Sequence, residues 1–188
     1  MDNRQQLLDS ALHLFSMRGY DAVGVQEIVV SVGLTKPSLY HYFGSKRGLL
    51  EALLKEKSAP FLEELETASA YRGDLSRTLE AVLDAYLDFA ESVPDFLRFV
   101  LSLLFCPPDH EAHAPAIALF SAQRDKIEAM FFAAAEDHGN MRGRHVRYAY
   151  IFIGLINSVV AAHISADGPI DTAQRRDILH QFSHGIYS

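Results

Sequence analysis

The chain has 188 residues, of which 49% are hydrophobic and 22% are charged, so the composition excludes a disordered protein. This length allows one large core, or a small domain joined to a larger one. A single cysteine excludes an internal disulfide and fits a reducing compartment. The first residues lack the apolar core and cleavage site of a secretory signal, so we expect a cytoplasmic protein.

The formal net charge of −7 is unevenly distributed. Residues 1–60 contain seven basic and six acidic residues, a net charge of +1. Residues 61–188 contain ten basic and eighteen acidic residues, a net charge of −8. Between residues 28 and 50 there are three basic residues and no acidic residue. Such a local positive potential is typical of a surface that binds a polyanion.

Three helices are predicted in this N-terminal part. Apolar residues at positions 8, 11, 12 and 15 have the spacing of a helix face, and Gly19 ends that helix. A second helix begins at Gly24 or Val25, and Gly33 supplies the turn that follows. Thr35 is a good N-cap for the third helix. Two short helices joined by a tight turn can place side chains in the major groove of DNA.

Helical patterns continue through the remainder of the chain. A long helix from Ser45 to about residue 70 contains Pro60, which predicts a kink or a break near a domain junction. No alternating strand pattern is present, so we expect an all-α fold of about nine helices, with domains at 1–58 and 59–188. The further helices are predicted from apolar stripes over 79–90, 96–106, 117–134, 148–164 and 178–186.

Residues 148–164 are uncharged and approach the length of a membrane span. About 20 residues are usually required, and Asn157 and His163 lie within the stretch, so we expect a helix packed against protein and no membrane. One of its faces mixes small and large residues at helical spacing, which suits packing against a second subunit. That face consists of Ile151, Gly154, Leu155, Ser158 and Ala162.

Little in the sequence indicates catalysis or metal binding. Cys106, Asp109, His110 and His113 do not have the spacing of a standard zinc site, so no metal and no cofactor are expected. A glycine-rich phosphate loop, a nucleophile elbow and an HExxH pair are absent, which argues against an enzyme. Arg124 interrupts an apolar stripe, where a charge requires a partner or a ligand.

The segment GLTKPSLYHYFGSK, residues 33–46, strongly resembles the recognition segment of the TetR family of bacterial transcriptional regulators, and the close match extends over residues 4–54. The resemblance implies a helix-turn-helix head that contacts a palindromic operator in double-stranded DNA. The chain departs from the family at Gly24, where Thr or Ser is common. The positions implied to contact DNA are Gly24, Val25, Thr35, Lys36, Pro37, Ser38, Tyr40, His41, Tyr42 and Lys46.

The resemblance also implies that the C-terminal bundle binds a small, usually apolar effector and forms a homodimer. Ordinary core packing is the alternative for each candidate effector residue, because such pockets and cores have similar compositions. The effector candidates are Tyr86, Phe89, Phe96, Phe99, Leu103, His113, Phe120, Arg124, Ile127, Tyr148, Phe152 and Asn157. Ile178, Leu179 and Phe182 join the face of 148–164 in the expected dimer interface.

We therefore expect a ligand-responsive, sequence-specific DNA-binding regulator, a repressor that leaves its operator when the effector binds. Two alternatives remain open at this point. The effector could instead promote DNA binding, or the chain could be a helical interaction protein without DNA binding.

Overall fold

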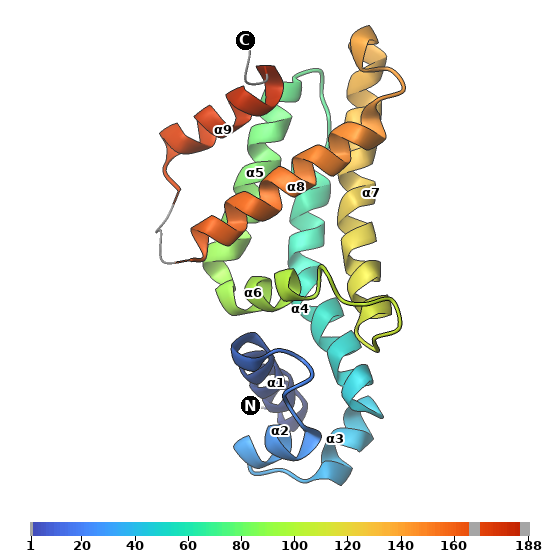
Figure 1. Ribbon diagram of the computed structural model, residues 1–188, viewed down its shortest axis with the longest axis vertical. Coiled ribbons are helices and arrows are strands. Elements are labelled where there is room, and N and C mark those ends of the chain that lie inside the picture. The colour runs from blue at the N-terminus through green and yellow to red at the C-terminus, as the bar shows by residue number, and fades with distance from the viewer. Residues whose placement is uncertain (1, 166–169, 185–188) are drawn as a thin grey trace. The chain divides into compact units, whose positions relative to one another are not determined.

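A computed structural model describes residues 2–165 and 170–184, and these residues form nine α-helices, one 3₁₀ turn (Gly139–Met141) and no strand (Figure 1). The all-α prediction is confirmed. The predicted continuation of the last helix to residue 186 lies outside the described residues. The helices are α1 (Asn3–Arg18), α2 (Val25–Ser31), α3 (Lys36–Phe43), α4 (Lys46–Ala68), α5 (Leu75–Ser92), α6 (Pro94–Ser102), α7 (His113–Asp137), α8 (His145–His163) and α9 (Thr172–His184).

The chain divides into two compact units. The first unit combines Met1–Ala59 with Val93–Leu119, and the second combines Pro60–Ser92 with Phe120–Ser188. Helix α6 and the α6–α7 loop therefore belong with the N-terminal helices. The assignment of separate functions to residues 1–58 and 59–188 stays a prediction.

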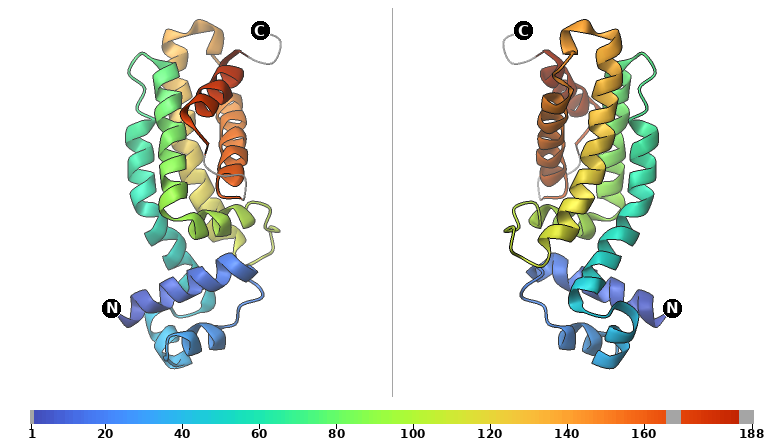
Figure 2. Two further views of the ribbon diagram at one scale, coloured as in Figure 1. Left: turned by 90° about the vertical axis from the view of Figure 1, so that its left-hand side faces the viewer. Right: turned by 90° about the vertical axis from the view of Figure 1, so that its right-hand side faces the viewer.

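The first unit is assembled around α1, which contacts α2, α3 and α6 (Figure 2). Asp2 caps α1 by accepting a hydrogen bond from the Arg4 backbone N–H at 3.4 Å. The buried face of α1 includes Phe15, whose ring stacks on that of Phe99 from α6 at a centroid distance of 5.3 Å. Aromatic packing thus joins two segments that are far apart in the sequence.

Of the kink or break predicted at Pro60, the break is wrong, because α4 is continuous from Lys46 to Ala68, whereas the kink stays a prediction. Proline removes one backbone N–H from the helix. The apolar residues on both sides of it, Leu54 and Phe61 among them, are buried and hold the two halves of the helix in their respective cores. The boundary between the compact units nevertheless falls at this proline.

The corner between α3 and α4 is tightly packed. Ser45 caps α4 by accepting a hydrogen bond from the Gly48 N–H at 2.9 Å. A Cβ atom at position 48 would collide with the carbonyl oxygen of Phe43, which is backbone and cannot rotate away. Only glycine therefore fits position 48 with this corner geometry.

In the second unit, α5 lies beside α8 and α9 (Figure 1). The stripe predicted for α5 is confirmed, since Leu79, Val82, Leu83, Tyr86 and Ala90 are all buried. Within the described residues, α8 is the helix that is long and apolar enough to cross a membrane by length and composition alone. Only 28% of its apolar window is buried here, so much of its apolar surface is exposed in the single chain.

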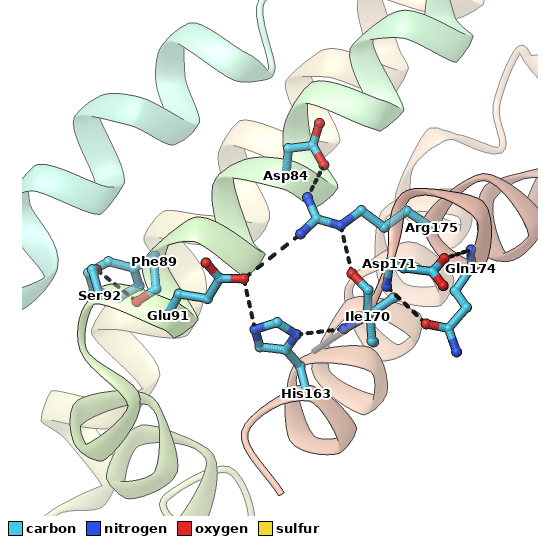
Figure 3. Close-up of polar contacts among 9 residues, drawn as sticks. All are labelled: Asp84, Phe89, Glu91, Ser92, His163, Ile170, Asp171, Gln174 and Arg175. Carbon is cyan, nitrogen blue, oxygen red and sulfur yellow. Dashed lines mark hydrogen bonds and ion pairs between the residues drawn. The ribbon is translucent and has the colours of Figure 1, made fainter. Parts of the chain in front are cut away.

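Polar contacts fasten α9 and the end of α8 to α5 (Figure 3). Arg175 on α9 donates to Asp84 on α5 at 2.7 Å and to the Ile170 carbonyl at 3.2 Å. The buried His163 accepts the Ile170 N–H at Nδ1, so its neutral form carries the proton on Nε2, 3.4 Å from Glu91. The backbone N–H and C=O of Ile170, just before α9, are therefore both hydrogen-bonded to side chains.

Helix α6 ends at Ser102, earlier than the predicted residue 106. Cys106 precedes a proline, and a residue in that position disfavours helical backbone angles. The last turn closes instead through hydrogen bonds such as Leu104 N–H to Leu101 C=O at 3.2 Å. Phe105, which the predicted helix would have placed on an apolar face, is 89% exposed.

The position of α3 depends on one buried side chain, Leu39. We predict that Leu39→Ala lowers the free energy of unfolding by about 2–5 kcal/mol, because it leaves a cavity in a close-packed core. Denaturant unfolding measures this change, with His41→Ala, an exposed position on the same helix, as the control. Equal effects of the two substitutions would contradict this anchoring role.

Candidate nucleic-acid interface

The turn between α2 and α3 depends on Gly33, whose φ of +69° lies in the left-handed region. A side chain would strain the backbone at that angle. The Leu34 N–H donates to the Val29 carbonyl at 2.8 Å and closes the turn. The predicted two-helix arrangement is confirmed, and it sets α3 against α2 with only Leu39 of α3 buried.

The outward surface of α3 carries most of the predicted DNA contacts. Tyr40 is 46% exposed and Tyr42 37% exposed, and the rings of His41 and Tyr42 meet edge to face at 5.3 Å. Val30 of α2 is also 63% exposed in the same unit. The exposed side chains of α3 are Lys36, Pro37, Tyr40, His41 and Tyr42.

The helix N-termini are only partly capped by side chains. Thr35 is the N-cap of α3, but its hydroxyl lies 3.1 Å from that of Ser38 and makes no hydrogen bond to the backbone. Gly24, the N-cap of α2, has no side chain to offer, and the following Val25 is half-buried. Backbone N–H groups at both ends therefore remain for an external acceptor such as phosphate.

The structure describes all basic side chains between residues 2 and 59, and these side chains differ in whether they form an ion pair. Four of them bind carboxylates: Arg4 with Glu56, Arg18 with Glu27, Arg47 with Glu51 and Lys57 with Asp9. Among residues 2–59, Lys36 and Lys55 form no ion pair or hydrogen bond through their side chains, and both are exposed. Only Lys36 lies on α3, so it is the cation that this surface offers to a polyanion.

Lys46 is not free. Its Nζ donates to the Tyr20 carbonyl at 2.7 Å and lies 3.9 Å from the centroid of the Tyr20 ring, a cation–π contact. Burial lowers the pKa of Lys46, although the nearby carboxylates of Glu111 and Asp21 act to raise it. The predicted phosphate contact by Lys46 requires this side chain to leave Tyr20, and it stays a prediction.

The sequence does not predict the contacts that His110 makes with Tyr20 and Asp21. His110 Nε2 lies 2.7 Å from Asp21 Oδ1, and the rings of His110 and Tyr20 are roughly perpendicular, with centroids 5.9 Å apart. These residues are 89 positions apart in the sequence, and no local pattern connects them. The sequence suggests His110 only as a candidate metal ligand. Among the residues described, no group of three or more His, Cys, Asp or Glu side chains could hold a metal ion.

The predicted effector residues fall in both units. Phe96, Phe99, Leu103 and His113 belong to the first unit, where Phe99 packs on Phe15. In the second unit the Tyr86 hydroxyl donates to the buried Gln123 at 2.9 Å, a partner that the sequence reasoning missed. The other second-unit candidates are Phe89, Phe120, Arg124, Ile127, Tyr148, Phe152 and Asn157.

Several of these candidates take part in ordinary packing. Phe152 contacts the rings of Phe131 and Phe182 at 5.9 and 4.9 Å. Arg124 has the partner that its position required, because it binds Asp125 at 3.1 Å. An open groove of about 580 Å³ between α4 and α7, lined in part by Glu66 and Lys126, contains none of the predicted effector residues.

The predicted dimer face is largely exposed on α8. Leu155 and Ile178 are half-buried, whereas Leu179 is buried and Phe182 packs on Phe152 inside its own unit. Those two residues of α9 therefore point mainly inward. The exposed members of the predicted face are Ile151, Gly154, Ser158 and Ala162.

Comparison with known proteins gives this geometry a context. Residues 7–53 match the family described as bacterial regulatory proteins, tetR family. The transcriptional activator FasR of Mycolicibacterium smegmatis is 28% identical over 98% of this chain and 82% of its own length. The transcriptional repressor BdcR of Escherichia coli is 44% identical, but over only 28% of this chain and 26% of its own length.

Solved structures share the fold. The TetR family transcriptional regulator PfmR of Thermus thermophilus matches with a TM-score of 0.73 and 22% identity, over 97% of this chain and 100% of its own. FadR of Bacillus subtilis, in complex with stearoyl-CoA, matches with a TM-score of 0.80 and 19% identity, over 97% and 99% of the two chains. The helix-turn-helix head, the matched family and the shared fold agree. Residues 7–53 thus carry the DNA-binding domain of the TetR family of bacterial transcriptional regulators, and the whole chain shares the fold of solved members of that family.

Proposed function

We propose that the chain acts in the cytoplasm as a homodimer that binds a palindromic operator, and that a small apolar effector releases it. The observation that carries the DNA-binding part is Lys36, an exposed lysine at the N-terminus of α3 with no ion pair in residues 2–59. Helix-turn-helix proteins read bases near that end of the second helix, while flanking groups bind phosphates. Pro37, Ser38 and His41 are the proposed base contacts, and Thr35, Tyr40 and Tyr42 the proposed backbone contacts, with Gly24 and Val25 at the start of α2.

The proposed dimer interface is the exposed face of α8. Tyr150 is 59% exposed and Ile151 is 53% exposed, although both are large and apolar. Small residues follow at helical spacing, which would let a second helix approach closely. Exposed apolar surface of this kind marks an interaction site. A dimer also supplies the two heads, separated by roughly 34 Å, that a palindrome in successive major grooves requires.

An apolar acyl chain is the proposed effector class. One structural neighbour was solved in complex with stearoyl-CoA, and another is a fatty acid degradation regulator from Bacillus halodurans. The candidate residues here are mostly aromatic or aliphatic, with the Tyr86–Gln123 pair as a buried polar contact among them. Effector binding changes operator occupancy strongly if it favours, by only a few kcal/mol, an arrangement of the two heads that does not fit the operator.

The opposite response is a second candidate, because the relative that matches over 98% of this chain is named an activator. In that case the effector strengthens operator binding. Both candidate functions use the same DNA-binding head and the same dimer. They differ only in whether effector binding weakens or strengthens operator binding.

Lys36→Ala should weaken operator binding and reduce the slope of log K against log salt by about 0.9, because one phosphate contact is lost. Fluorescence anisotropy at several salt concentrations measures the slope. Lys55→Ala, an exposed lysine of the same unit outside α3, is the matched control and should leave it unchanged. An unaltered slope for Lys36→Ala would remove that residue from the interface.

Ile151→Glu should convert the dimer to monomers at micromolar concentration, because it places a charge at the centre of the apolar face of α8. Ile117→Glu, at a similarly exposed isoleucine of the first unit, is the control and should preserve the dimer. Sedimentation velocity distinguishes the two states. A dimer that survives the first substitution would place the interface elsewhere.

Stearoyl-CoA or stearate should lower operator affinity while the protein remains dimeric. Anisotropy reports the affinity, and sedimentation of the same samples reports the assembly. Increased affinity would support the activator-like response instead. Dissociation into monomers would show a mechanism different from a change in head arrangement.

A further inference from the structure

Lys46 and the turn between α1 and α2 form one connected arrangement. The Lys46 ammonium binds the carbonyl and the ring of Tyr20, which is only 4% exposed. The ring of Tyr20 in turn packs against Phe15 at 5.1 Å. In this position the lysine, the first residue of α4, is directed into its own head instead of toward solvent.

The α6–α7 loop holds the same turn from the other side. The Ala112 N–H donates to His110 Nδ1 at 3.2 Å, so the neutral imidazole carries its proton on Nε2. That proton is donated to Asp21, the residue directly after Tyr20, at 2.7 Å. A T-shaped contact between the rings of Tyr20 and His110 completes the arrangement. The loop thus binds both residues of the turn that retains Lys46.

The loop itself is anchored within the same unit. Cys106 Sγ lies 3.1 Å from His110 Nδ1, and His113 Nδ1 lies 3.0 Å from the Cys106 carbonyl. Upstream, Phe99 of α6 stacks on Phe15 of α1. His110 is hydrogen-bonded at both ring nitrogens, and its loop is anchored at several points. It can therefore fix the positions of Tyr20 and Asp21.

We propose that His110 and Asp21 form a clasp that keeps Lys46 on Tyr20, away from DNA phosphate, so that opening the clasp adds a phosphate contact to operator binding. The inference rests on the proposed function, in which α3 and the start of α4 face DNA. His110 and Asp21 are positioning residues in it, because they act through Tyr20 on Lys46.

The surroundings of Lys46 in the closed arrangement do not favour its charge. Burial disfavours the charged form of Lys46, and the carboxylates of Glu111 and Asp21 offset this effect only in part, since its pKa remains lowered. The Tyr20 hydroxyl is buried without a hydrogen bond of good geometry, and burial together with the nearby Glu111 carboxylate raises the pKa of Tyr20, so the hydroxyl stays neutral beside Lys46. A phosphate competes directly, since it offers Lys46 a charged acceptor in place of a neutral carbonyl.

The test compares salt slopes of operator binding for single and double variants. His110→Phe keeps a ring against Tyr20 but removes both ring nitrogens, and Asp21→Ala removes the clasp from the other side. Each should steepen the slope by about 0.9, so that roughly threefold more affinity is lost between about 50 and 200 mM salt. Adding Lys46→Ala to either variant should restore the wild-type slope, whereas Lys46→Ala alone should change it little.

Two controls separate this effect from simpler ones. Asp109→Ala removes an exposed carboxylate from the same loop and should not steepen the slope. The slope of wild-type protein, with its reduction in Lys36→Ala, establishes DNA binding itself, so failure of the proposed function would be recognised separately. The clasp is overturned if His110→Phe leaves the slope unchanged, or if Lys46→Ala alone lowers it by a full contact.

A measurement without DNA guards against loss of structure in the variants. Carbon-13 labelling of lysine Cε follows the titration of Lys46 by NMR. In His110→Phe and Asp21→Ala the pKa of Lys46 should rise toward its ordinary value as the side chain becomes solvated. A folded variant in which that resonance titrates as in wild-type protein would contradict the proposal.

Discussion

The packing of Phe15 against Tyr20 and Phe99 is the contact on which the head depends. It brings α1, the following turn and α6 together, with ring centroids 5.1 and 5.3 Å apart. Tyr20 then presents its carbonyl to Lys46, and its ring makes a T-shaped contact with that of His110. Helix α1, the first residue of α4 and a loop from more than 80 positions away are thus organised around the Phe15–Tyr20 pair.

Charge distribution explains how an acidic chain can present a surface to DNA. The six carboxylates of residues 2–59 are all engaged, five of them with basic side chains and Asp2 as a helix cap. Such surface pairs contribute little stability individually. Their effect here is to neutralise the head locally. Helix α3 itself contains no acidic residue, so the charge of Lys36 is not offset on its own helix.

Most of the head could be predicted from local patterns. The bounds of α1, α2 and α3 follow from the apolar spacing and from Gly19, Gly24 and Gly33, because these signals act within a few residues. The role of Lys46 could not be predicted, since its acceptor is a backbone carbonyl that no residue type reveals. The His110–Asp21 contact depends on the tertiary position of a loop. In the second unit, periodicity identified the buried face of α5 but could not distinguish a filled core from a cavity.

The corner at Gly48 has a mechanical consequence. Because its backbone lies against the Phe43 carbonyl, and Ser45 ties the first turn of α4, the third and fourth helices cannot hinge independently. Rotation of the first turn of α4 therefore carries α3 with it, and the two act as a single lever at this corner.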